Sequence, residues 1–117
     1  MIRCGELLVL LGDEEVVVID CRTPEDWEAV AMHIPGALHM PLVDLAQNSH
    51  VLPDDEMIVL VGWERDDLDA LRARQLLLLR GHRAVCLEGG LRGWIRAGYP
   101  LERHGERWPP GVTTASR

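Results

Sequence analysis

The sequence predicts a single α/β domain built on a mainly parallel β-sheet with helices on its faces. Short runs of β-branched and aliphatic residues are typical of strands covered on both faces, and three occur here: 16–19, 58–61 and 84–87. Strands that alternate with helical patterns favour right-handed crossovers and hence a parallel sheet. The chain has 117 residues, which is one domain's worth, since domains usually run to roughly 100–150 residues.

The N-terminal half predicts short helices between its strands. Leucines at helical spacing indicate a helix over residues 5–12. Thr23 is placed to cap a second helix, with Pro24 at the first helical position. We expect the inward face of this helix to carry three residues, Trp27, Val30 and Ala31. A brief strand at 38–40 and one or two helical turns at 42–47 follow.

The C-terminal half predicts the longest helix and the end of the domain. The long helix spans about residues 67–80, and the glycines 89–90 turn the chain into a last helix that Gly98 stops. We therefore place the domain at residues 1–103. Residues 104–117 are polar, carry two adjacent prolines and predict an extended tail.

Composition and charge exclude several classes of function. Hydrophobic residues make up 47% and charged residues 26% of the chain, as in ordinary globular proteins. The sequence shows neither an apolar run of the roughly 18 residues that a membrane span needs nor a signal peptide, so we expect a cytoplasmic protein. The protein is acidic, with a net charge of −7 and a pI of about 5.1. Its cations are scattered arginines, which argues against a nucleic acid or an anionic membrane as partner.

Three segments resemble, in order, the signatures of rhodanese-like domains. They are residues 17–27, 33–37 and 87–94, and the one departure is Met32, where the family usually has glycine. The resemblance covers about residues 2–102. It implies a small α/β domain with a central parallel sheet of about five strands, and sulfurtransferase chemistry in active members.

In such members a cysteine thiolate follows the strand that corresponds to 58–61. It takes a sulfane sulfur from a donor such as thiosulfate and becomes a persulfide, while the amides of its loop cradle the substrate. Here that position falls on Gly62, between Val61 and Trp63, and no cysteine lies beside it. Because a thiolate is the required nucleophile, we expect a pseudoenzyme that lacks conventional thiosulfate sulfurtransferase activity.

The loop that corresponds to the active-site loop is acidic. It comprises Gly62, Trp63, Glu64, Arg65, Asp66 and Asp67. Asp66 or Asp67 is expected to cap the following helix and to occupy amides that a substrate would use. The acids fit a solvated helix start, a surface for a cationic or arginine-bearing partner, or a weak cation site. Trp63 fits either partial burial or an aromatic anchor for a partner.

The three cysteines leave an alternative function open, because burial as a small hydrophobic residue is only one of the roles that a cysteine can have. Cys21 is the reserve nucleophile, since it ends a parallel strand at the edge where α/β proteins bind ligands, and the adjacent Arg22 could lower its pKa. Cys86 is the weaker candidate. The chain could therefore be a sulfurtransferase or sulfur carrier that uses a non-standard cysteine.

The first hypothesis is a binding or regulatory module, with a protein partner or small molecule at the face of loop 62–67. A homodimer through the C-terminal tail, which contains Trp108, is a further possibility. We expect no metal and no cofactor, because the histidines have no metal-ligand spacing: residues 33, 39, 50, 82 and 104.

Overall fold

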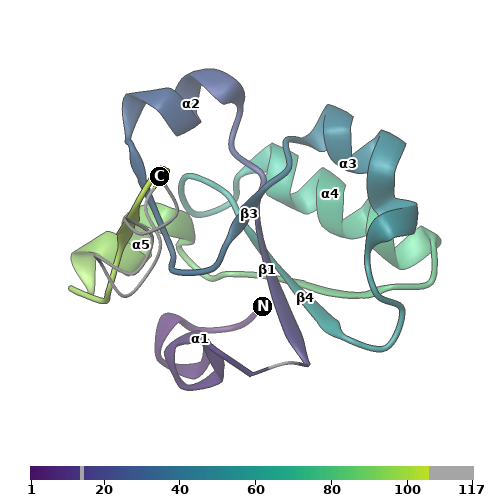
Figure 1. The fold of residues 1–117 in the computed structure, drawn as a ribbon, viewed down its shortest axis with the longest axis horizontal. Coiled ribbons are helices and arrows are strands. Elements are labelled where there is room, and N and C mark those ends of the chain that lie inside the picture. The colour runs from purple at the N-terminus through teal and green to yellow at the C-terminus, as the bar shows by residue number, and fades with distance from the viewer. Residues whose placement is uncertain (14, 106–117) are drawn as a thin grey trace, which may run out of the picture.

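The computed structural model describes residues 1–13 and 15–105. The described chain forms a four-stranded parallel sheet with the order β3-β1-β4-β5 (Figure 1). Its strands are β1 (Val16–Asp20), β3 (Leu38–His39), β4 (Met57–Val61) and β5 (Arg83–Cys86). The expected fifth strand is reduced to one parallel bridge between Ile2 and Leu87, because α1 begins two residues after Ile2 and leaves no length for a strand.

Helices cover both faces of this sheet. They are α1 (Cys4–Leu10), α2 (Pro24–Ala29), α3 (Leu42–Asn48), the 3-10 turn η1 (Ser49–Val51), α4 (Leu68–Leu79) and α5 (Gly90–Arg96). Figure 1 shows α3 and α4 on one side and α1 and α5 on the other. Two hydrophobic clusters fill the two interfaces, one with Ile58 and Leu60 of β4 and the other with Val59 and Val61. Successive side chains of β4 therefore pack into the two cores on opposite faces of the sheet.

The expected N-terminal caps of α2 and α4 are present. The hydroxyl of Thr23 accepts the Asp26 N–H at 3.2 Å and begins α2, and the Asp67 carboxylate begins α4. The expectation that Ala31 points inward is wrong. Helix α2 ends at Ala29, and the exposed Ala31 lies beyond it in extended chain. No helix of the described residues has both the length and the apolar character needed to cross a membrane.

A small second sheet brings the end of the domain back onto α2. Strand β2 (Met32–His33) pairs antiparallel with β6 (Glu102–Arg103). Just after β6, the N–H of His104 donates to the carbonyl oxygen of Ala31 at 3.0 Å. His104, which we placed at the start of the tail, therefore packs against the domain. Residues 106–117 of the predicted tail lie outside the described residues.

Candidate functional site

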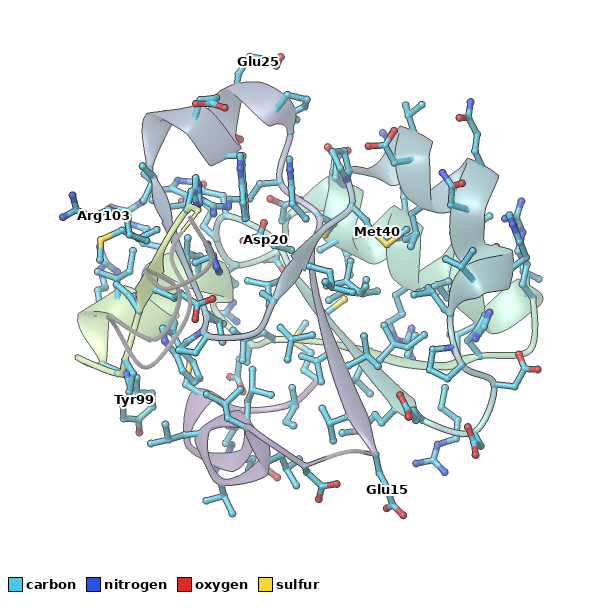
Figure 2. All side chains as sticks on the ribbon, viewed as in Figure 1. Glu15, Asp20, Glu25, Met40, Tyr99 and Arg103 are labelled. Atoms are coloured by element: carbon cyan, nitrogen blue, oxygen red, sulfur yellow. The ribbon has the colours of Figure 1, made fainter. Side chains whose placement is uncertain are left out.

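The loop of residues 62–67 joins β4 to α4 at the carboxyl edge of the sheet. Cys21 follows β1 and Leu87 follows β5 at the same edge. Asp20, the last residue of β1, lies near the centre of Figure 2. In open α/β sheets this edge is where ligands bind. The predicted loop and Cys21 are therefore brought together by parallel strand pairing.

Gly62 has no room for a side chain because the side chain of Asp67 occupies it. A Cβ on Gly62 would lie 2.6 Å from Cγ, 2.7 Å from Cβ and 2.9 Å from Oδ2 of Asp67. All three distances are far inside van der Waals contact, which is near 3.5–4.0 Å for carbon. The φ of Gly62 is not in the left-handed region. The glycine is thus required by Asp67 and not by the local backbone.

The Asp67 carboxylate uses the amides at the entrance to α4. Its Oδ1 accepts the N–H of Ala70 at 3.1 Å, and its Oδ2 accepts the N–H of Trp63 at 2.9 Å. The sequence left open whether Asp66 or Asp67 caps the helix, and the structure selects Asp67. Asp66 is exposed and adopts a left-handed φ of 59°. The protein therefore supplies its own anion at the start of α4.

Helix α5 holds the loop from the other side. The N–H of Leu91 donates to the carbonyl oxygen of Gly62, and the N–H of Arg92 donates to the carbonyl oxygen of Trp63. Both N···O distances are 2.9 Å. This approach requires Gly90, which has φ 62°, because a Cβ there would lie 2.8 Å from the amide nitrogen of Glu64. These carbonyl oxygens of the loop and the first N–H groups of α5 therefore have one another as hydrogen-bond partners.

The charge around the loop is more balanced than the loop sequence indicates. Arg92 forms a 2.9 Å ion pair with Glu64, and Arg65 lies 3.9 Å from Asp66. A groove of about 480 Å³ runs between the loop and α5 and is also lined by Arg96. A smaller cavity of about 20 Å³ is bounded by the loop, Ala70 and Cys86, which is room for about one water molecule. Trp63 is half-buried against the α5-side core.

The structure gives no thiol near the loop the character of a nucleophile. Cys21 is 1% exposed, and its Sγ donates to the carbonyl oxygen of Val61 at 3.4 Å. Burial raises the pKa of Cys21 well above its ordinary value, and the carboxylates of Asp67 and Asp20 raise it further. The pKa lowering that the sequence suggested for Cys21 is absent, because Arg22 is bound to Asp20 instead.

The other two thiols also stay protonated at neutral pH. Burial raises the pKa of Cys86, with Arg74 opposing part of the shift, and its Sγ contacts the carbonyl oxygen of Ala70 at 3.5 Å. Burial and the charge of Glu88 raise the pKa of Cys4. All three cysteines are free thiols. Free, protonated and mostly buried thiols are poor nucleophiles.

A second cluster, which sequence reasoning missed, lies beneath α2. We call Trp27, His33, His39 and His104 the Trp27–histidine cluster. The indole of Trp27 stacks between the rings of His104 and His39, with centroids 3.6 Å and 4.1 Å away. His33 Nδ1 lies 2.8 Å from His104 Nδ1, and His33 Nε2 lies 2.9 Å from Glu102 Oε1. The histidines are far apart in sequence, so their spacing gave no signal.

The buried Arg22 organises the same region. Its Nε is 2.9 Å from the Asp20 carboxylate, and both side chains are almost fully buried. Its guanidinium also donates to the carbonyl oxygens of Val30 and Met32 at 3.2 and 3.0 Å and lies over the Trp27 ring. Among the described residues no group of histidine, cysteine and carboxylate side chains has the arrangement of a metal site.

The structure is an open parallel α/β domain whose loop 62–67, between the central strand β4 and helix α4, contains no thiol. The sequence model of the rhodanese-like domain family matches residues 4–97. The chain belongs to the rhodanese-like domain family, as its three signatures indicated.

Individual relatives agree with this assignment. A sulfurtransferase of Allochromatium vinosum is 30% identical over 93 residues, which are 79% of this chain and 83% of that protein. An HTH-type transcriptional regulator of Mycobacterium tuberculosis is 31% identical over 98 residues, 84% of this chain but only 42% of the regulator. A solved structure of a Lactobacillus plantarum protein superposes with a TM-score of 0.79 at 30% identity, covering 87% of both chains.

Proposed function

We propose that this chain is a binding or regulatory module on the rhodanese fold, without conventional thiosulfate sulfurtransferase activity. One observation carries the proposal: the Asp67 carboxylate fills the space above Gly62 and accepts the N–H groups of Trp63 and Ala70. A substrate anion has neither a thiol to react with in this loop nor those two amides to bind.

Electrostatics supports the same conclusion. Two like charges about 5 Å apart repel by roughly 3 kcal/mol at an effective dielectric near 20. A helix N-terminus contributes only about 0.3–1 kcal/mol to the binding of an anion. An anionic sulfur donor that approached Asp67 would therefore meet more repulsion than the start of α4 can offset.

The names of two relatives bear on this proposal. The name of the Allochromatium vinosum protein points to sulfur transfer, which in this chain would need a thiolate that none of the three cysteines provides. The Mycobacterium tuberculosis relative is by name a transcriptional regulator, and the similar segment is less than half of it. That relative supports a regulatory use of such a domain.

Steady-state turnover of thiosulfate and cyanide to thiocyanate and sulfite tests the proposal. The full chain should give no thiocyanate above the protein-free rate, with an enzyme of measured thiosulfate–cyanide sulfurtransferase activity as the positive control. Turnover within about tenfold of that control would overturn the proposal.

A second candidate function is sulfur transfer or storage on a non-standard thiol. It is favoured by the position of Cys86, which borders the small cavity together with Gly62 and Asp67. Incubation with a low-molecular-weight persulfide, followed by peptide mass spectrometry, separates the two functions. We expect no added sulfur on Cys21 or Cys86. A persulfide on either peptide that disappears in the matching Cys→Ser variant would favour the sulfur carrier.

A further inference from the structure

The end of the domain is attached by a short strand without aliphatic side chains. Strand β6 consists of Glu102 and Arg103 and pairs with β2 in a sheet of two strands. Directly after it, the ring of His104 stacks on the Trp27 indole, with centroids 3.6 Å apart. We call residues 102–104 the β6 strap. Polar contacts and ring stacking, more than apolar burial, therefore hold the strap on the domain.

A continuous chain of hydrogen bonds runs from α2 through two histidines to the strap. His104 Nε2 lies 2.7 Å from the carbonyl oxygen of Trp27, and His104 Nδ1 lies 2.8 Å from His33 Nδ1. His33 Nε2 lies 2.9 Å from Glu102 Oε1, which also accepts the N–H of Gly36 at 3.3 Å. His33 is 6% exposed, so its ring nitrogens depend on these protein partners.

The two ends of the chain fix the positions of its protons. A carbonyl oxygen can only accept, so His104 Nε2 carries a proton and Nδ1 of the neutral His104 ring is an acceptor. His33 Nδ1, its partner, must then donate. An ionised carboxylate also only accepts, so His33 Nε2 carries a proton as well. The complete chain thus requires a doubly protonated His33 between neutral His104 and ionised Glu102.

Other charged and titratable groups lie around the two histidines. Those that are wholly or partly buried come from the end of β1, from β3 and from β6: Asp20, Arg22, His39 and Glu102. Asp20 and Arg22 form an ion pair with each other, and His39 Nε2–H donates to the carbonyl oxygen of Arg22 at 2.9 Å. The remaining charged residues of α2 and β6 are exposed: Glu25, Asp26, Glu28 and Arg103. The anion in direct contact with the His33 ring is therefore Glu102.

We propose that the β6 strap is a pH-dependent switch, closed while His33 holds two ring protons and His104 holds one. In acid, a second proton on His104 removes the acceptor at its Nδ1. In alkali, loss of a proton from His33 leaves either Glu102 or His104 without its donor. Opening uncovers one face of the Trp27 indole. The switch goes beyond the function proposed above and does not depend on it.

The acid limit of the closed state is set by His104. Burial lowers the pKa of His104, and the nearby His33 and Arg22 lower it further, against the opposing effects of the Trp27 carbonyl and Asp20. The open strap therefore binds this proton more readily than the closed strap, so closure is lost as the pH falls below about 6.5, the ordinary histidine pKa. Because one proton is exchanged, the opening constant should rise by up to about tenfold per pH unit.

Native-state hydrogen exchange of the full chain, followed by NMR from about pH 5 to pH 9, tests the switch. The opening constant read from the N–H of His104, which donates to Ala31, should pass through a minimum and rise about tenfold toward either end. The N–H of Leu87, which donates to the carbonyl oxygen of Leu60 at 2.9 Å, reports opening of the main sheet and should not follow that curve.

Nitrogen-15 NMR of the histidine rings counts the protons directly. At the pH of the minimum, both ring nitrogens of His33 should carry a proton, whereas His104 should carry one on Nε2 alone. A closed strap with a singly protonated His33 ring would contradict the proposal.

Two variants separate the acid limit from the alkaline limit. His104→Gln has no titratable ring, so its opening constant should no longer rise in acid. Glu102→Gln removes the anionic partner of the His33 imidazolium, so the alkaline limit should move to lower pH while the acid limit stays. His50→Gln, at an exposed histidine, is the matched control and should change neither limit.

Three further results would refute the switch. An opening constant that does not change with pH removes the dependence on protons. Exchange at His104 that follows Leu87 at every pH assigns the effect to opening of the whole domain. An alkaline limit that is the same in wild type and Glu102→Gln excludes the pair of His33 and Glu102 as its cause.

Discussion

At the scale of single residues, the site depends on the pair of Gly62 and Asp67. The family resemblance implies a thiol at position 62, and a simple replacement of that thiol by glycine would leave the surrounding loop unchanged. The geometry shows instead that Gly62 and Asp67 depend on each other. The Asp67 side chain occupies the space that a side chain at position 62 would need, and it accepts the N–H groups of Trp63 and Ala70. Restoring a cysteine at position 62 would therefore disturb the start of α4.

We predict that Gly62→Cys lowers the free energy of unfolding by about 1–3 kcal/mol, the usual cost of overpacking. The added Cβ must displace Asp67, which then loses one or both of its amide partners. Urea denaturation followed by circular dichroism measures the loss. Asp67→Gly removes both the Cβ and the Cγ that a side chain at position 62 would meet, and glycine is tolerated at a helix N-cap, so Gly62→Cys should cost less in the Asp67→Gly background. Equal costs in both backgrounds would contradict the steric coupling.

At the scale of elements, Arg22 and the Trp27–histidine cluster tie α2, β2 and β6 together. Helix α2 buries no residue fully, so it contributes little apolar burial of its own. Arg22 instead binds the carbonyl oxygens of Val30 and Met32 beyond α2, and His104 Nε2 lies 2.7 Å from the carbonyl oxygen of Trp27. These polar contacts replace the core packing that other elements have.

Arg22→Lys should destabilise the protein by about 3–5 kcal/mol, although it preserves the charge. A lysine is a point charge and cannot bind the Asp20 carboxylate and several carbonyl oxygens in the fixed directions of a guanidinium. The loss leaves buried partners without hydrogen bonds. Thermal and urea unfolding measure it, with Arg96→Lys at an exposed site as the control. A cost below about 1 kcal/mol would show that Arg22 does not organise this region.

Acid should weaken the contact that His104 makes with the domain. His104 Nε2–H donates to the carbonyl oxygen of Trp27, so the Nδ1 of neutral His104, which lies 2.8 Å from Nδ1 of His33, is an acceptor. Burial lowers the pKa of His104, and the nearby His33 and Arg22 lower it further, whereas Asp20 and the Trp27 carbonyl oppose the shift.

The direction of the pH effect on stability follows from the difference between the pKa of His104 in the folded and in the unfolded chain. The unfolded chain binds this proton at a higher pH than the folded one, so the contribution of His104 is complete above about pH 6.5, the ordinary histidine pKa, and is lost as the pH falls toward the folded value. Unfolding midpoints of wild type and His104→Phe should therefore differ most near neutral pH and converge in acid. His50→Phe, the same substitution at an exposed histidine, is the matched control.

At the scale of the whole molecule, two hydrophobic cores share one sheet. The core beside α3 and α4 includes Leu77, and the core beside α1 and α5 includes Trp94, both with 0% exposure. Since alternate residues of β1 and β4 contribute to opposite cores, neither core can be lost while the sheet remains. The domain should unfold as one cooperative unit.

Leu77→Ala should lower the free energy of unfolding by about 2–5 kcal/mol through lost burial and a residual cavity. The far-UV signal and the tryptophan fluorescence should still change together, although Leu77 and Trp94 lie on opposite faces of the sheet. The exposed Leu79→Ala is the control and should cost less than about 1 kcal/mol. Separate transitions would show that the two cores are independent.

Much of this molecule was predictable from local patterns, but the site was predictable only in part. The buried β-branched runs placed β1, β4 and β5, and Thr23 marked the start of α2. The loop sequence indicated an acidic surface, yet α5 contributes Arg92 and Arg96 to the same surface. The raised pKa of Cys21 could not be predicted from the sequence, because it depends on burial and on the carboxylate of Asp67, which is distant along the chain.

By itself, the sequence determined the alternation of strands and helices, the family signatures and the absence of a thiol at position 62, because each is a property of residue identity or of local periodicity. Only the tertiary structure decided that Asp67 fills the space above Gly62 and that three distant histidines meet around Trp27. The physical reason is that crossovers and the final antiparallel pairing set these contacts, and their side-chain distances are not encoded in the spacing along the chain.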